Sequence, residues 1–128
     1  MEGNRRYTLD LSNNDPASGR LKRNELTESQ HPFAVILGCS DSRVPVELVF
    51  DQGLGDLFVI RVAGNIAAPS QIGSVEYAAS VLGSNLVVVR GHSQCGAIKA
   101  TLDEIRQPSG SQVGNINSIV RRISPALE

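Results

Sequence analysis

Three short apolar runs limit the folds open to this chain more than any other sequence feature. They cover residues 33–38, 58–63 and 86–90, and a glycine ends or directly follows each of them. Continuous apolar runs rich in β-branched residues are typical of strands that are buried on both faces of a parallel sheet. We therefore predict three strands in one buried sheet.

Segments with helical periodicity alternate with these strands. Residues 70–82 follow Pro69 and predict a crossover helix between the second and third strands. Two more helices are predicted after the third strand, on either side of a break at residues 108–110. Their apolar positions are Ile98, Leu102 and Ile105, then Val113, Ile116, Val120 and Ile123. The alternation predicts an α/β fold of three layers, with a small central parallel sheet flanked by helices.

The length and composition fit a single domain. The chain has 128 residues, of which 41% are apolar, and this is enough to form one hydrophobic core. Residues 1–31 are polar, lack a sustained apolar period and include a cluster of loop-forming residues from Ser12 to Gly19. We expect residues 1–128 to form one domain, with residues 1–31 as a polar N-terminal arm.

The charge pattern and the length of the apolar runs exclude several classes of partner. The formal net charge is -1 and both signs are interspersed, so no strong field attracts nucleic acid or anionic lipid. The short apolar runs and the polar N-terminus argue against a membrane span or a signal peptide. The sequence predicts a small-molecule ligand and a cytoplasmic protein.

Cys39, His92 and Cys95 follow the ends of predicted strands. Cys39 comes directly after Gly38, His92 comes after Gly91, and Cys95 lies at the start of the next predicted helix. Ligands of open parallel sheets bind beyond the carboxyl ends of the strands, where adjacent strands would bring these side chains together. Two thiolates and one imidazole, with one position left over, form the ligand set of a catalytic zinc ion. The pattern predicts a Zn²⁺ site.

Asp41 and Arg43 follow the first cysteine. A carboxylate–guanidinium pair would keep Asp41 ionised as a hydrogen-bond acceptor beside the metal. Taken singly, these residues have simpler explanations, because Cys39 fits a small buried residue and an Asp–Arg pair is usually a weak surface ion pair. Their convergence at one sheet end favours the metal site. His31 is expected to face solvent or to pack, and residues 53–55 to form a turn.

Two motifs of this site resemble the paired signature of β-carbonic anhydrases. They are Cys39-Ser40-Asp41-Ser42-Arg43-Val44 and Gly91-His92-Ser93-Gln94-Cys95-Gly96. The resemblance continues through residues 30–38 and 61–66 and covers most of the chain. It implies zinc-dependent reversible hydration of carbon dioxide to bicarbonate and a proton.

The same resemblance implies roles for individual residues. Cys39, His92 and Cys95 would bind zinc, and Asp41 with Arg43 would form the catalytic dyad. In some family members the aspartate leaves the arginine and closes the site as a fourth zinc ligand, and the sequence leaves the state of Asp41 open. A substrate pocket across a subunit interface would be formed by Gln30, Phe58, Ala63 and Tyr77. A homodimer or a higher homo-oligomer is therefore implied.

Two departures from the family pattern accompany the resemblance. Arg90 stands where the family usually has an apolar residue, and a buried cation is expected to pair with a carboxylate. Both ends of the chain look shortened, so we expect the C-terminal part of the family fold to be absent.

Three other functions stay open from the sequence. The first is a non-catalytic or weakly active zinc-binding module, and the second is a hydrolase of carbonyl sulfide or carbon disulfide that uses the same site. The third is a redox protein that uses Cys39 and Cys95, which would leave the neighbouring histidine and the Asp–Arg pair without a role.

Overall fold

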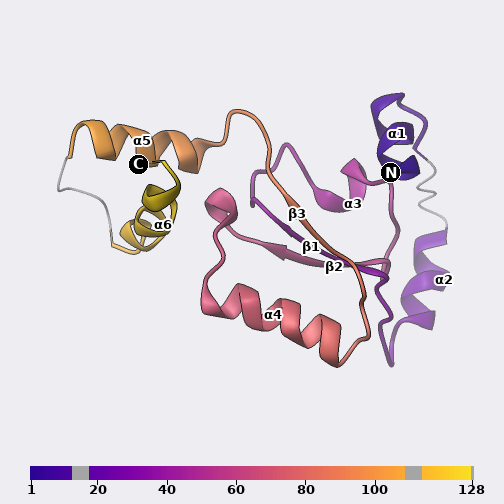
Figure 1. Ribbon diagram of the computed structural model, residues 1–128. Helices are drawn as coiled ribbons and strands as arrows, with labels where there is room; N and C mark the ends of the chain where they lie inside the picture. The colour runs from indigo at the N-terminus through magenta and orange to yellow at the C-terminus, as the bar shows by residue number, and fades with distance from the viewer. Residues whose placement is uncertain (13–17, 109–113, 128) are drawn as a thin grey trace.

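The computed structural model describes residues 1–12, 18–108 and 114–127 (Figure 1). None of the helices in these ranges combines the length and the apolar character needed to cross a bilayer. The α-helices are α1 (Glu2–Thr8), α2 (Ser18–Glu25), α3 (Val46–Val49), α4 (Pro69–Ser80), α5 (Gly96–Arg106) and α6 (Ile116–Ile123), and the 3₁₀ turns are η1 (Ala63–Asn65) and η2 (Ser124–Ala126).

The sheet has three parallel strands in the order β2-β1-β3, and the predicted α/β fold is confirmed. The strands are β1 (Ala34–Gly38), β2 (Leu57–Arg61) and β3 (Val87–Arg90). Every residue of the central strand β1 is buried. The second strand was expected to reach residue 63 but ends two residues earlier. The pairing stops at Arg61 because its partner strand β1 ends at Gly38, and the chain then enters η1, where Gly64 adopts a left-handed φ of 72°.

Helices cover the two faces of the sheet. Figure 1 shows α4 on one side of the strands, and α3 with α1 on the other. On the α4 face, the buried core consists of Val35, Leu37, Ile60 and Ala78. On the α3 face, it consists of Ala34, Ile36 and Val46. The alternate residues of β1 thus point into two different cores, which explains why the strand is apolar throughout.

The helices α5 and α6 pack against each other and against η1, beyond the ends of the strands. Val120 and Ile123 of α6 are buried, as their helical spacing predicts. Gly64 of η1 lies so close to α6 that a Cβ atom there would be 2.4 Å from Ile123 Cδ1. The close approach of η1 to α5 and α6 places these two helices beside the end of β2. Ser109 and Gly110 of the predicted break lie outside the described residues, and so does Val113 of the predicted final helix.

Residues 1–31, which were predicted to be a polar arm, contain the helices α1 and α2. Polar contacts hold α1 against α3 and the residues that follow it. The Asn4 amide donates to the Val49 carbonyl over 2.8 Å, and Arg6 Nε lies 2.5 Å from the buried Asp51 carboxylate. Such contacts leave no apolar periodicity in the sequence. Residues 13–17 of the loop-forming cluster lie outside the described residues.

Candidate metal centre

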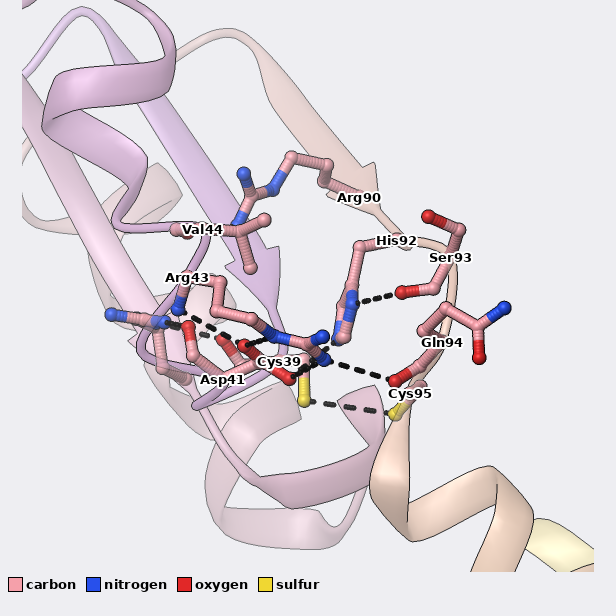
Figure 2. A network of polar contacts seen from close by, with 10 residues as sticks. Cys39, Asp41, Arg43, Val44, Arg90, His92, Ser93, Gln94 and Cys95 are labelled. Carbon is pink, nitrogen blue, oxygen red and sulfur yellow. Dashed lines mark hydrogen bonds and ion pairs between the residues drawn. The ribbon is translucent and has the colours of Figure 1, made fainter.

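Three metal-ligating side chains meet at the carboxyl ends of β1 and β3 (Figure 2). Cys39 directly follows β1, His92 lies two residues after β3, and Cys95 is the N-cap residue of α5. Their ligand atoms all lie within 4.8 Å of one another, and the two sulfur atoms are 3.9 Å apart. The pairing of β1 with β3 therefore brings these residues together as the sequence predicted.

The ring of His92 presents a free nitrogen to the two sulfur atoms. Its Nδ1 lies 2.9 Å from the Ser93 carbonyl oxygen, so that this nitrogen carries the proton and donates. Its Nε2 is buried and has no hydrogen-bond partner among the described residues. A buried nitrogen whose lone pair is free, on a ring held by a carbonyl at the other nitrogen, is the arrangement of a metal-bound histidine.

The environment of Cys39 favours its thiolate form. Burial raises the pKa of the Cys39 thiol. A protonated His92 ring, the backbone of Asp41 and Gly64, and the Cys95 side chain together lower it more strongly, and the resulting pKa is about 7. A thiolate, not a thiol, is the form that binds a metal. The site thus supplies a soft anionic ligand near neutral pH.

Asp41 and Arg43 form a bidentate ion pair beside the ligands. Arg43 donates from Nε to Asp41 Oδ1 over 2.9 Å and from Nη2 to Oδ2 over 2.6 Å, and its backbone N–H donates to Oδ1 over 3.0 Å. These hydrogen bonds hold the pKa of the Asp41 carboxyl well below its usual range, and they raise the pKa of Arg43. Asp41 is therefore ionised and paired with Arg43, with its Oδ2 3.9 Å from His92 Nε2.

Gln94 contributes a contact that sequence reasoning missed. Its carbonyl oxygen accepts a hydrogen bond of 2.9 Å from Arg43 Nη2, and this contact ties the Asp–Arg pair to the loop that carries His92 and Cys95. Gln94 adopts a φ of 57°, which is uncommon for a residue other than glycine. Because the contact uses a backbone atom, the identity of the side chain carries no signal for it.

The three ligands border a hollow of about 180 Å³. It is lined by Cys39, Gly64, Asn65, Gly91, His92, Cys95 and Ile98. Two sulfur atoms and one imidazole nitrogen would supply three of the four ligands that zinc prefers, and the hollow beside them has room for a small molecule. The donor set therefore fits a zinc ion with one open position.

Comparison with known proteins identifies the family. A sequence profile of the carbonic anhydrases matches residues 34–128. The solved structure of the β-carbonic anhydrase CcaA is similar to 98% of this chain and 60% of its own, with a TM-score of 0.73 and 31% identity. This chain belongs to the β-carbonic anhydrase family.

Other members of the family match the chain over much of its length. A carbonic anhydrase of Mycolicibacterium smegmatis is 49% identical over 115 residues, which are 88% of this chain and 54% of that protein. A structure of tetrameric β-carbonic anhydrases from Sordaria macrospora matches 85% of this chain and 55% of its own, with a TM-score of 0.70 and 27% identity. The chain thus spans little more than half the length of these relatives.

The four predicted pocket residues do not line the hollow at the metal ligands. The rings of Phe58 and Tyr77 lie 6.1 Å apart, and Ala63 begins η1. Gln30 and Tyr77 line a separate open hollow of about 570 Å³ between the start of β1 and α4. Within one chain of this β-carbonic anhydrase, the described residues therefore place Gln30 and Tyr77 apart from Cys39 and its partner ligands.

Arg90 does not pair with a carboxylate among the described residues, contrary to the expectation from the sequence. Its Nη2 donates to the Val44 carbonyl oxygen over 2.5 Å, and its Nε is buried without a partner in the described part of the chain. Burial lowers the pKa of the Arg90 guanidinium, and the nearby charge of Arg61 lowers it further. A backbone carbonyl satisfies part of this cation because the end of β3 lies beside the loop that follows β1.

Proposed function

We propose that this chain catalyses the reversible hydration of carbon dioxide to bicarbonate and a proton, with Zn²⁺ held by Cys39, His92 and Cys95. The observation that carries the proposal is the convergence of these three ligands around the unpartnered, buried Nε2 of His92 in the described part of the chain. Family membership and the names of the relatives support the same reaction. The chain spans 54% of the M. smegmatis relative.

The metal ligands would serve both binding and reactivity. When bound there, zinc supplies Lewis acidity that makes water a nucleophile near neutral pH. Cys39 and Cys95 bring two negative charges, and His92 is oriented by the Ser93 carbonyl oxygen. Since the protein fills three positions, one remains for exchange with solvent and substrate.

The Asp41–Arg43 pair would orient the attacking group. Arg43 keeps Asp41 ionised, so that the carboxylate accepts hydrogen bonds and does not donate them. Its Oδ2 lies 3.9 Å from His92 Nε2, at the rim of the ligand set. An acceptor fixed there aligns the proton of a water or hydroxide and leaves its lone pair directed at the carbon of carbon dioxide.

We also propose that the substrate pocket is completed by a second copy of the chain. Gln30 and Tyr77 lie away from the metal ligands of their own chain, and Tyr77 is 47% exposed. A dimer would let Gln30, Phe58 and Tyr77 of one chain reach the hollow of the other. Ala63 directly precedes Gly64, which lines that hollow. The tetrameric relatives of Sordaria macrospora support a homodimer or a higher homo-oligomer. We also propose a cytoplasmic location, because a reducing compartment keeps the two thiol ligands reduced.

Stopped-flow measurement of carbon dioxide hydration by the zinc-loaded protein tests this function. We expect turnover in the natural chain and in Gly73→Ala, a variant whose new methyl group meets no atom within 4 Å. Cys39→Ser should abolish turnover, because it removes one of the three ligands. Absence of turnover in a folded chain that holds one zinc ion would reject the proposal.

A further inference from the structure

The loop at residues 39–45 carries three functional side chains but has few backbone hydrogen bonds of its own. It connects β1 to α3 and contains Cys39, Asp41 and Arg43. Ser40 N–H donates to the carbonyl oxygen of Val62, the residue before η1, over 3.3 Å, and Val44 N–H donates to the Asp41 carbonyl oxygen over 3.2 Å. The Pro45 carbonyl oxygen accepts from Val49 N–H of α3 over 3.0 Å. Two arginine side chains bind carbonyl groups of this loop as well.

Arg61 binds two of these carbonyl groups. It is the last residue of β2 and lies in register with Gly38, the last residue of β1. Its Nε donates to the Cys39 carbonyl oxygen over 2.8 Å, and its Nη2 donates to the Asp41 carbonyl oxygen over 2.6 Å. One planar guanidinium thus fixes the distance between the backbone carbonyl groups of Cys39, a candidate metal ligand, and Asp41 of the Asp–Arg pair.

Arg90 binds a third carbonyl group from the opposite side. It is the last residue of β3 and lies in register with the same Gly38. Its Nη2 donates to the Val44 carbonyl oxygen, directly after Arg43 (Figure 2). The two arginines therefore reach the loop from the two outer strands and hold its beginning, middle and end.

The surroundings of Arg90 disfavour its positive charge. Its Nε is buried and has no partner in the described part of the chain, and the Arg61 guanidinium adds an unfavourable like charge. An apolar side chain could fill the same space without burying an unpartnered nitrogen atom or a like charge. The hydrogen bond to the Val44 carbonyl oxygen is a favourable contact that an apolar side chain could not make.

We propose that Arg61 and Arg90 are positioning residues that hold the 39–45 loop so that Asp41 and Arg43 keep their geometry at the metal ligands. Their role in turnover rests on the proposed function, whereas their effect on the loop does not. Neither arginine touches the reacting atoms. Both act through backbone carbonyl groups, and this distinguishes them from Arg43, whose side chain binds the Asp41 carboxylate directly.

Hydrogen exchange of the zinc-loaded protein tests the effect on the loop without any assay of activity. The Arg43 backbone N–H donates to Asp41 Oδ1, so its exchange rate reports the geometry of the pair. In Arg61→Met we expect this N–H to exchange about tenfold faster, the effect of losing charged hydrogen bonds, while the Leu37 amide in β1 keeps its rate. Arg106→Met removes an exposed arginine of α5 and should change neither rate.

An unchanged Arg43 exchange rate in folded Arg61→Met and Arg90→Met would overturn the proposal. Uniform acceleration that includes Leu37 would overturn it as well, because it would indicate a general loss of stability. If Arg61→Met does not fold, Arg90→Met carries the test, since Arg90 makes one hydrogen bond to the loop, with the Val44 carbonyl oxygen, among the described residues. Arg61→Lys keeps the charge without the planar fork and should restore only part of the protection.

A double-mutant cycle links the same residues to turnover. Arg61→Met should lower kcat by about tenfold in the natural chain but by less than about twofold in an Asp41→Asn background, where the geometry of the pair no longer matters. Equal losses in both backgrounds would overturn the positioning role. If the natural chain shows no turnover at all, the proposed function fails, and the exchange experiment still decides the role of the arginines in the loop.

Discussion

Replacing Gly64 with alanine should destabilise the fold and loosen the metal site together. A Cβ atom at Gly64 would lie 2.4 Å from Ile123 Cδ1 and 3.1 Å from Ala97 Cβ. The φ of 72° adds a cost of about 1–2 kcal/mol for a residue with a side chain. Overpacking of this kind costs about 1–3 kcal/mol. We expect a total loss of about 2–5 kcal/mol, a large part of the unfolding free energy of a small domain.

The terminal methyl group of Ile123 offers a way to separate the two costs. Ile123→Val removes the Cδ1 atom, which would lie 2.4 Å from the new methyl group at residue 64, and by itself costs about 1 kcal/mol. In the Ile123→Val background, Gly64→Ala should therefore cost about 1 kcal/mol less than in the natural chain, because the steric part is relieved while the backbone part remains.

Urea denaturation at a fixed zinc concentration measures these differences. Gly73→Ala is the matched control, since its methyl group meets nothing within 4 Å and should stabilise the helix by up to about 1 kcal/mol. Gly64 also lines the hollow at the metal ligands, so Gly64→Ala should weaken zinc binding in a competition with a chelator. A Gly64→Ala protein within about 0.5 kcal/mol of the natural chain would refute the close packing of η1 on α6.

Three further perturbations probe the ligands, the Asp–Arg pair and the N-terminal helix. His92→Ala removes the only imidazole ligand of the group and should lower zinc affinity by at least about 100-fold, as measured by chelator competition; unchanged affinity would exclude His92 as a ligand. Asp41→Asn should retain zinc but lower kcat by about 100-fold in stopped-flow assays, and full activity would exclude an orienting role for the carboxylate. Arg6→Met should destabilise the fold by about 2 kcal/mol in urea denaturation, because it removes an ion-pair partner of the buried Asp51, and a neutral result would argue against the anchoring of α1.

The sequence predicted the sheet well because strand burial leaves a direct mark on residue type. Both faces of β1 are covered, so Val35 and Leu37 are apolar for one core and Ile36 for the other. The end of β2 was placed two residues too late, since Val62 and Ala63 are apolar as well. Val62 is still extended, but the pairing ends at Arg61 because its partner strand β1 ends at Gly38. The residue types of Val62 and Ala63 carry no sign of where that partner ends.

The candidate ligands were predictable for a similar reason. Cys39 and His92 follow strand ends, and a small parallel sheet brings such positions together. The contacts that hold the site were not predictable. Arg61, Arg90 and the Gln94 carbonyl act through backbone oxygen atoms, which every residue possesses, so no pattern of residue types identifies them. The position of α1 was not predictable either, because polar contacts with residues far along the chain hold this helix in place.

Titration of zinc into the metal-free chain, with the rate of carbon dioxide hydration measured at each step, tests the proposed zinc-dependent activity most directly. We predict a rate that rises in proportion to bound zinc, stops rising at one ion per chain, and stays at the uncatalysed level when Cys39 is replaced by serine. A chain that binds one zinc ion through Cys39, His92 and Cys95 yet never exceeds the uncatalysed rate would contradict this prediction.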